Sequence, residues 1–151
     1  MTPTCAREQL TSHMNRETLK AFDAGQVEYS YPRGRVLLGK GELSDGIYLI
    51  HSGRVRVTRE SNGAARGSRI ARPGEILGLS TAVSGRPSDA TAETLGPSRV
   101  SFMPKEALMK LMQRDAGFAY CVVRTLCESL ADPFDRFRSP RRRSRRLTSK
   151  R

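Results

Sequence analysis

Short runs of alternating apolar and polar residues, separated by glycines, fill the first two thirds of the chain. Nine of its 13 glycines lie between Gly34 and Gly78. Because glycine readily adopts turn conformations that other residues avoid, this spacing indicates many short strands joined by tight turns. The runs that we expect to form strands are residues 27–31, 47–49, 55–57, 89–94 and 99–103. Such a pattern is typical of an all-β sandwich or barrel.

Two segments that flank these strands have a helical period instead. Residues 15–24 place Leu19 and Phe22 on one face and are followed by Gly25, which predicts a short helix. After Pro104 the apolar residues recur every three or four positions, which predicts an amphipathic helix that begins at this proline. These apolar residues are Ala107, Leu108, Leu111 and Met112.

A third helix is expected over residues 116–131, because apolar residues recur there every four positions and Pro133 follows. The recurring residues are Phe118, Val122, Leu126 and Leu130. The apolar stripe is wide for a helix that covers a single β domain. It either packs back on the chain's own strands or pairs with the same helix of a second chain. We predict a homodimer that pairs through these four residues.

Positive charge is concentrated at the C-terminal end of the chain. The chain has 27 basic and 15 acidic residues, a net charge of +12, and residues 133–151 alone hold eight arginines, one lysine and one aspartate. Blocks of like charge repel one another and stay solvated. We therefore expect a folded domain at residues 15–131 and a basic, disordered tail at residues 132–151.

The basic tail has more than one interpretation. Its arginines could neutralise nucleic-acid phosphates without reading a base sequence; the candidates are Arg141, Arg142, Arg143, Arg145 and Arg146. It could equally be a solvated tail with no partner, or the remainder of a longer chain. No aromatic residue follows Phe137, so the tail itself offers no ring on which a base could stack.

Several classes of protein are disfavoured by what the sequence lacks. No run approaches the ~18 consecutive apolar residues of a membrane span, and the N-terminus lacks the basic-then-apolar order of a secretory signal. We therefore expect no membrane association and a cytoplasmic location. Three cysteines without Cys-x-x-Cys spacing and two histidines, His13 and His51, are too few for a disulfide framework, a metal site or His-based catalysis. We predict a non-enzyme without a metal or cofactor.

One ordered set of motifs is similar to a known family. Residues 41–57 read Gly-Glu-Leu-Ser-Asp-Gly-Ile-Tyr-Leu-Ile-His-Ser-Gly-Arg-Val-Arg-Val, with Tyr-Pro-Arg-Gly upstream at 31–34 and Pro-Gly-Glu-Ile-Leu-Gly downstream at 73–78. This set resembles the cyclic-nucleotide-binding domains of the catabolite-activator and fumarate–nitrate-regulator superfamily. The resemblance covers residues 15–131 and implies a mainly β fold, a double-stranded β-helix or jelly roll (the β-roll) with flanking N- and C-terminal α-helices. It also implies a sensor function in transcription regulation.

Three glycines of these motifs have structural roles whether or not a ligand binds. Gly34, Gly46 and Gly53 fall where tight turns need a positive φ or the absence of a side chain. They support the fold and do not report on activity.

The phosphate-binding cassette that the resemblance implies departs from the family's usual residues. In ligand-binding members, a Glu early in the cassette holds the ribose hydroxyl, and a later Arg pairs with the cyclic phosphate. By this resemblance, Leu79 occupies the position of the Glu and Ser88 that of the Arg, and Asp89 adds a negative charge. Arg86 lies nearby, but Pro87 and the alternation of side chains along a strand oppose its use as a replacement.

This departure disfavours the family's usual ligands. A bidentate Arg–phosphate contact contributes roughly 1.5–3 kcal/mol, so we predict that cyclic AMP and cyclic GMP do not bind. A different small polar ligand could still meet the hydroxyls of the cassette, and an empty, vestigial roll is the alternative. The candidate ligand-binding residues are Gly78, Leu79, Ser80, Ser88, Asp89 and Thr91.

Regulators of this superfamily continue with a DNA-reading helix-turn-helix domain, and residues 132–151 are too short and too polar to form one. Three accounts stay open: a stand-alone sensor or adaptor that dimerises, a truncated gene product, or a protein whose tail binds nucleic acid non-specifically. We predict a non-enzymatic regulatory module with a divergent cassette. The alternative is a nucleic-acid-associated protein that acts through its Arg-rich tail.

Overall fold

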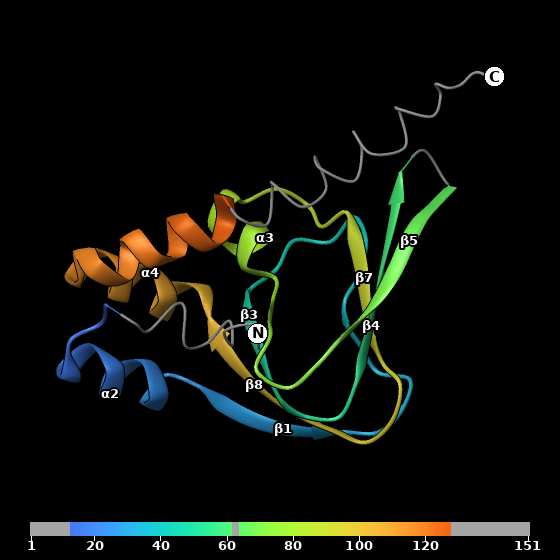
Figure 1. Ribbon diagram of the computed structural model, residues 1–151, viewed down its shortest axis with the longest axis horizontal. Coiled ribbons are helices and arrows are strands. Elements are labelled where there is room, and N and C mark those ends of the chain that lie inside the picture. Colours follow the sequence, from blue (N-terminus) through green and yellow to red (C-terminus); the bar gives the residue numbers. More distant parts are fainter. Residues whose placement is uncertain (1–12, 62–63, 128–151) are drawn as a thin grey trace, which may run out of the picture.

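The molecule is built on a β-roll of two antiparallel sheets (Figure 1). The computed structural model of the protein describes residues 13–61 and 64–127, and the side chains of residues 60–66 are not described. The strands are β1 (Val27–Tyr31), β2 (Val36–Leu38), β3 (Gly46–Ser52), β4 (Val55–Ser61), β5 (Ala64–Ala71), β6 (Ile76–Leu77), β7 (Ala90–Thr94) and β8 (Ser98–Pro104). One sheet has the order β1-β8-β3-β6 and the other β2-β7-β4-β5. Because most neighbours are distant in sequence, the chain winds back and forth between the sheets.

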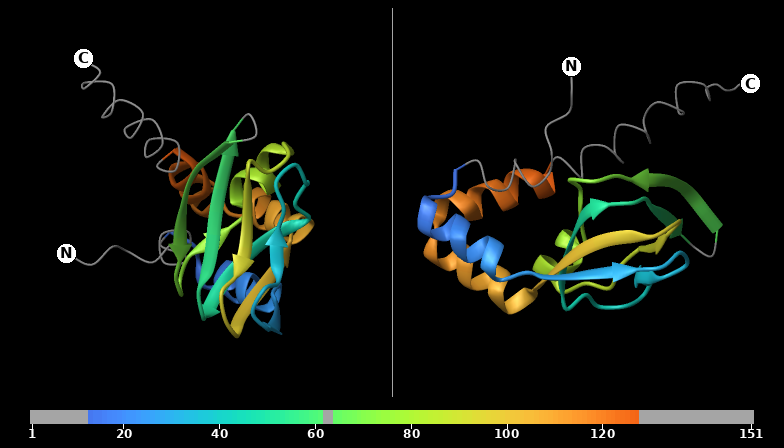
Figure 2. Two further views of the ribbon diagram at one scale, coloured as in Figure 1. Left: turned by 90° about the vertical axis from the view of Figure 1, so that its right-hand side faces the viewer. Right: turned by 90° about the horizontal axis from the view of Figure 1, so that it is seen from below.

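Helices gather at one end of the roll, opposite the end at which β4 ends and β5 begins (Figure 2). They are α2 (Arg16–Ala24), α3 (Leu79–Ser84) and α4 (Lys105–Arg114), and residues 116–127 are helical as well. Among these described residues, no helix is both long and apolar enough to cross a membrane.

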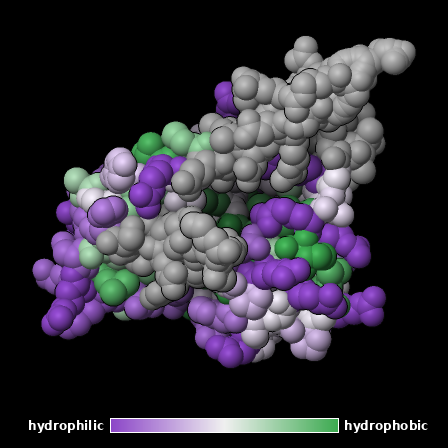
Figure 3. Space-filling view, viewed as in Figure 1, coloured by the Kyte–Doolittle hydropathy of each residue, from purple (hydrophilic) through white to green (hydrophobic). Residues whose placement is uncertain are grey.

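The first helix, α2, begins and ends where its sequence indicates. The side chain of Asn15 caps it by accepting a hydrogen bond of 2.8 Å from the Thr18 N–H, and Gly25 follows its last residue. Its inner face buries Phe22, which meets Phe118 edge-to-face with ring centroids 5.9 Å apart. The part of the surface that α2 forms is largely hydrophilic (Figure 3). The helix is therefore held by one apolar face.

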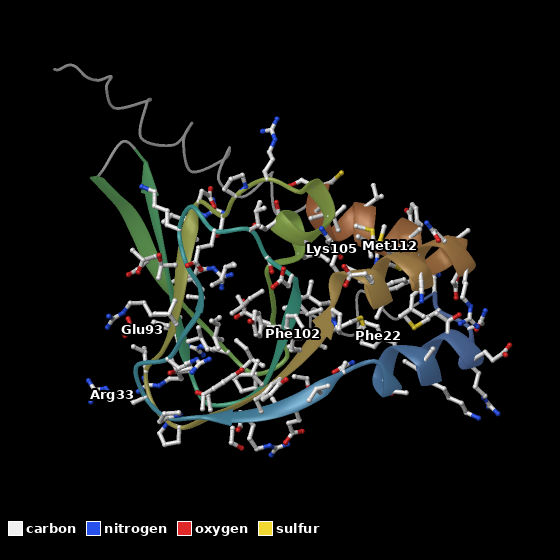
Figure 4. All side chains as sticks on the ribbon, turned by 180° about the vertical axis from the view of Figure 1, so that it is seen from behind. Phe22, Arg33, Glu93, Phe102, Lys105 and Met112 are labelled. Carbon is white, nitrogen blue, oxygen red and sulfur yellow. The ribbon has the colours of Figure 1, made fainter. Side chains whose placement is uncertain are left out.

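Strand β3 separates two hydrophobic cores. Ile47 and Leu49 pack against the helices, whereas Tyr48 and Ile50, on the opposite face of the strand, pack inside the roll. Phe22 lies among the helices and Phe102 within the roll (Figure 4). A strand buried on both faces explains why residues 46–50 are almost continuously apolar rather than alternating.

The structural roles expected of the motif glycines are confirmed at the two ends of β3. A Cβ at Gly46 would collide with the backbone oxygen of Met103 on β8. Gly53 has a φ of +96°, and a Cβ there would overlap Ser98. Both positions therefore require glycine for packing, and Gly53 requires it for backbone conformation as well.

The predicted elements agree with the structure except where the strands lack alternation. The predictions over residues 27–31, 47–49, 55–57, 89–94 and 99–103 are confirmed as β1, β3, β4, β7 and β8. The helices predicted at residues 15–24 and after Pro104 are confirmed as α2 and α4. Strands β2, β5 and β6 were not individually predicted from the pattern. Of the helix predicted over residues 116–131, the part up to residue 127 is helical, and the rest lies outside the described residues.

Candidate functional site

The cassette connects β6 to β7 through the short helix α3 (Figure 1). Gly78 is the N-cap of α3 and makes no side-chain cap, and Gly85 follows its last residue. The structure therefore places a strand, a turn, one short helix and a second strand in the order that the resemblance implies.

Leu79, which the resemblance assigns to the position of the ribose-binding Glu, is part of the core. Its side chain is only 7% exposed, and it belongs to the helix-side cluster with Ile47, Leu49 and Leu108. A carboxylate at this position would lie in hydrocarbon and lose its hydration. Leu79 therefore anchors α3 and offers no group to a sugar hydroxyl.

Ser88, which the resemblance assigns to the position of the phosphate-binding Arg, uses its hydroxyl for hydrogen bonds within the protein. The hydroxyl donates to the backbone oxygen of Ala90 (2.8 Å) and accepts from the Ala90 N–H (3.1 Å). The Ser88 N–H donates to the Glu42 oxygen (2.9 Å), and its own oxygen accepts from the Gly41 N–H (2.7 Å). The side chain is 6% exposed. Ser88 thus joins the loop before β3 to the start of β7.

The other cassette candidates divide between this loop and the solvent. Thr91 accepts a hydrogen bond of 3.1 Å from the Lys40 N–H, on the same loop that Ser88 contacts. Ser80, Asp89 and Arg86 are exposed. The structure therefore bonds Ser88 and Thr91 to the same loop, at residues 40–42, and places three polar side chains at the surface.

The predicted dimerisation residues are mostly committed to the chain's own core. Phe118 and Val122 are completely buried, and Leu126 packs against the same cluster. On the remaining surface of the helix, Tyr120 and Val123 are 59% and 54% exposed. The described part of the stripe thus packs on its own domain, which was one of the two alternatives. A second apolar face, formed by Tyr120 and Val123, is exposed.

Some predicted residues lie outside the described part of the chain. They are Leu130 and the tail arginines Arg141, Arg142, Arg143, Arg145 and Arg146. Within residues 13–61 and 64–127, no three His, Cys, Asp or Glu side chains come together in a way that could hold a metal ion.

Sequence reasoning missed Asp115, which joins two helices. Its carboxylate accepts from the N–H groups of Gly117 (3.0 Å) and Phe118 (3.2 Å), and from the Asn15 N–H (3.2 Å). The Asn15 bond is the largest influence that holds the pKa of Asp115 below its ordinary value, the other donors add to it, and burial opposes it. An Asp directly before a helix is a common N-cap signal, but the contact with Asn15 has no local signature.

Sequence reasoning also missed a group of aromatic side chains that face the inside of the roll. Tyr48 lies against Phe102 with ring centroids 5.1 Å apart, and Tyr29 stacks on Tyr31 at 5.7 Å. Burial raises the pKa of the Tyr48 phenol; Tyr31 adds to the shift, and Arg35 opposes it. The alternation of Tyr29 and Tyr31 predicted that they share a strand face, but it gave no indication that Tyr48 and Phe102 lie on the same face of the sheet.

Comparison with known proteins decides the family. The model of the cyclic nucleotide-binding domain matches residues 28–115, which is more than half of the chain. The chain belongs to this family. The match includes the motif region, the cassette and both sheets of the cyclic nucleotide-binding domain.

Solved structures share the fold. The catabolite activator protein of Thermus thermophilus has a TM-score of 0.76 and 22% identity, over 85% of this chain and 61% of that one. The sensor domain of the transcriptional regulator DNR from Pseudomonas aeruginosa has a TM-score of 0.70 and 18% identity, over 86% of this chain and 89% of that one. Both comparisons support the β-roll with flanking helices.

A curated relative matches a smaller segment. The cAMP/cGMP-dependent 3',5'-cAMP/cGMP phosphodiesterase B of Dictyostelium discoideum is 30% identical over 56 residues, which are 37% of this chain and 5% of that protein. The chain thus spans a small part of that relative. This match carries nothing over about the enzyme's activity.

Proposed function

We propose that this protein is a non-enzymatic regulatory module of the cyclic nucleotide-binding domain family whose cassette does not recognise a cyclic nucleotide. The observation that carries the proposal is the state of Leu79 and Ser88. Leu79 is buried in the helix-side core, and Ser88 has its hydroxyl bonded to the backbone of Ala90 at the start of β7. Neither position presents a charged group to a sugar or a phosphate.

The energetic consequence follows from the missing charges. A charge-assisted hydrogen bond to phosphate contributes roughly 1.5–3 kcal/mol, about a 10- to 150-fold change in affinity. The exposed Asp89 beside Ser88 adds repulsion. A hydrogen bond from the Ser88 hydroxyl to a ligand would also replace its bonds to Ala90. The cassette therefore acts as a packing and loop-tying element.

The regulatory output is proposed to pass through the helix at residues 116–127. Phe118 and Val122 fix the helix on the roll because they are completely buried. The exposed Tyr120 and Val123 are available to the same helix of a second copy. Burial of two large apolar side chains on each copy favours pairing.

Calorimetric titration with cyclic AMP and cyclic GMP tests the cassette. The unmodified protein is expected to give no saturable heat, whereas the pair of substitutions Leu79→Glu and Ser88→Arg, which restores the family's usual residues, is expected to gain affinity if the double variant keeps a cooperative melting transition. Ser80→Arg is the matched control, because it adds the same charge at an exposed position of the cassette. Saturable binding by the unmodified protein overturns the proposal.

A second candidate function rests on the charge of residues 132–151, which include the arginines from Arg141 to Arg146. We propose this segment as a separate tail after the domain at residues 15–131. If it binds DNA, affinity should fall with salt with a log–log slope of about −0.9 for each phosphate contacted. Deletion of residues 139–151 should then abolish binding, and equal binding by the shortened protein contradicts this candidate.

A further inference from the structure

Three of the chain's four tyrosines lie on one face of one sheet. Phe102 on β8 pairs with Tyr48 on one side and with Val27 on the other. Tyr29 and Tyr31 follow Val27 at intervals of two, so they share its face of the sheet. Tyr31 and Tyr48 pack against the apolar cluster inside the roll. This set of rings therefore faces the interior rather than the outer surface.

The side chains nearest the edge of the roll are nevertheless open to solvent. Tyr29 is 43% and Val27 is 52% exposed, because β1 is the edge strand of its sheet. Phe102, deeper in the roll, lies above β1 in Figure 4, and Arg33 marks the turn at the far end of β1. The aromatic cluster, defined as Tyr29, Tyr31, Tyr48 and Phe102, thus runs from a half-buried end at Tyr48 and Phe102 to an accessible one at Tyr29.

One arginine is held over this cluster. The Cζ atom of Arg35 lies 5.1 Å from the centre of the Tyr31 ring, a distance at which a guanidinium is attracted to a ring face. Its backbone is fixed to β7, because the Arg35 N–H donates to Oγ1 of Thr94 (2.8 Å) and its oxygen accepts from the Thr94 N–H (2.9 Å). Thr94 is 1% exposed. The arginine is therefore anchored at its backbone by β7.

The charge at this edge selects the sign of a ligand. Arg35 lowers the pKa of the Tyr48 phenol more than Asp45 raises it. The carboxylate of Glu28 on β1 is paired with Arg99 at 2.9 Å. A cation entering among the rings would be repelled by Arg35, although tyrosine faces alone would attract it. The phenol of Tyr48 is protonated at neutral pH, as for an ordinary tyrosine, so it can donate a hydrogen bond.

We propose that the aromatic cluster and Arg35 form a binding site for a small planar aromatic anion, whose ring packs against the exposed Tyr29 at the open end of the cluster and whose negative group pairs with Arg35. The site lies at the edge of the roll formed by β1 and the turn that follows it, apart from Leu79 and Ser88 of the cassette. The inference rests on the proposed function in one respect: it supplies a ligand class for a regulatory module that does not recognise cyclic nucleotides.

Calorimetric titration of the full chain with 2-naphthoate tests this site. For a ligand of this size, a dissociation constant of about 1 mM or below is expected. The cationic analogue 2-naphthylmethylammonium should bind at least about 10-fold more weakly. Arg35→Ala should weaken naphthoate binding by about 10-fold or more, and Tyr48→Phe by a smaller factor because it keeps the ring. Arg86→Ala, which removes an exposed arginine of the cassette, should leave binding unchanged.

The outcomes separate this inference from the proposed function. Absence of saturable heat with naphthoate, equal binding of the cationic analogue, or undiminished binding by an Arg35→Ala variant with an unchanged melting temperature each overturns the site. An equal loss in Arg86→Ala overturns it as well. Saturable binding of cyclic AMP by the unmodified protein contradicts the proposed function, whatever the naphthoate result.

Discussion

The backbone N–H of Asn15 donates a hydrogen bond to Oδ2 of Asp115 across 3.2 Å, although the two residues are 100 positions apart. Asn15 caps α2, and Asp115 caps the helix at residues 116–127. One buried carboxylate therefore fixes the starting points of two helices relative to each other. Because the second of these helices carries the open apolar face, the contact connects the packing of the domain to the surface through which we propose it acts.

Replacement of Asp115 by Ala should lower the free energy of unfolding by about 1–2 kcal/mol, the usual loss for a helix N-cap. The pKa of Asp115 is lowered in the folded protein, so its charge stabilises the fold above the unfolded value of about 3.9, and this contribution disappears as the pH falls through the folded pKa. Urea unfolding between pH 3 and pH 7 measures both effects.

Asp115→Asn isolates the charge, because asparagine keeps the shape and can still cap a helix. Its stability deficit should be constant near neutral pH and shrink as the pH drops below about 4. Asp89→Asn, at an exposed carboxylate, is the control and should have a small effect. A deficit for Asp115→Asn that grows toward acid would contradict the assignment.

Replacement of Ser88 by Ala should destabilise the protein by about 1–3 kcal/mol, because it removes a buried hydroxyl that bonds both polar groups of the Ala90 backbone. The exposed Ser80→Ala change is the matched control and should stay within about 0.5 kcal/mol. Thermal and urea unfolding measure the difference. Equal stability of the two variants would show that the Ser88 hydroxyl is not needed by the fold and is free for another role.

Replacement of Gly46 by Ala should cost about 3 kcal/mol or more, because the new Cβ would overlap the backbone oxygen of Met103 and a backbone cannot move aside like a flexible side chain. Gly96→Ala is the control, since a Cβ there has no neighbour within 4 Å and the backbone has no positive φ. Chemical unfolding of both variants compares them. A Gly46→Ala protein as stable as Gly96→Ala would mean that β3 and β8 are farther apart than described.

The two faces of the helix at residues 116–127 should respond differently to substitution. Phe118→Ala should lower the free energy of unfolding by about 3–5 kcal/mol, because the ring is completely buried and packs on Phe22. Tyr120→Ser combined with Val123→Ser should leave stability within about 1 kcal/mol but weaken self-association. Sedimentation over a range of protein concentrations measures the latter, and a monomer at all concentrations for the unmodified chain removes the dimer proposal.

The sequence predicts strands well where one face is buried and poorly where pairing alone defines the strand. β1, β4 and β8 alternate, so their positions follow from the pattern. Strand β5, Ala64–Ala71, has small and polar residues and no alternation; its place comes from its pairing with β4. Strand β6 has two residues and exists through its pairing with β3. Such strands need the fold before they can be recognised.

The chemistry of the candidate site was only partly accessible from the sequence. The absence of charged groups at Leu79 and Ser88 could be read directly, because it needs only residue identity. The bonds from Ser88 to Ala90 depend on the bend at the start of β7. The gathering of Tyr48 with Tyr29 and Tyr31 depends on β8 lying between β1 and β3. Contacts of this kind join residues that no local spacing connects.

The most direct test of the divergent cassette is a two-dimensional amide NMR titration of the full chain with cyclic AMP. The account predicts that the amides of Gly78, Leu79, Ser88 and Ala90 keep their chemical shifts, because the cassette packs on its own core and bonds to its own backbone. Saturable shifts that concentrate on these four amides would contradict it.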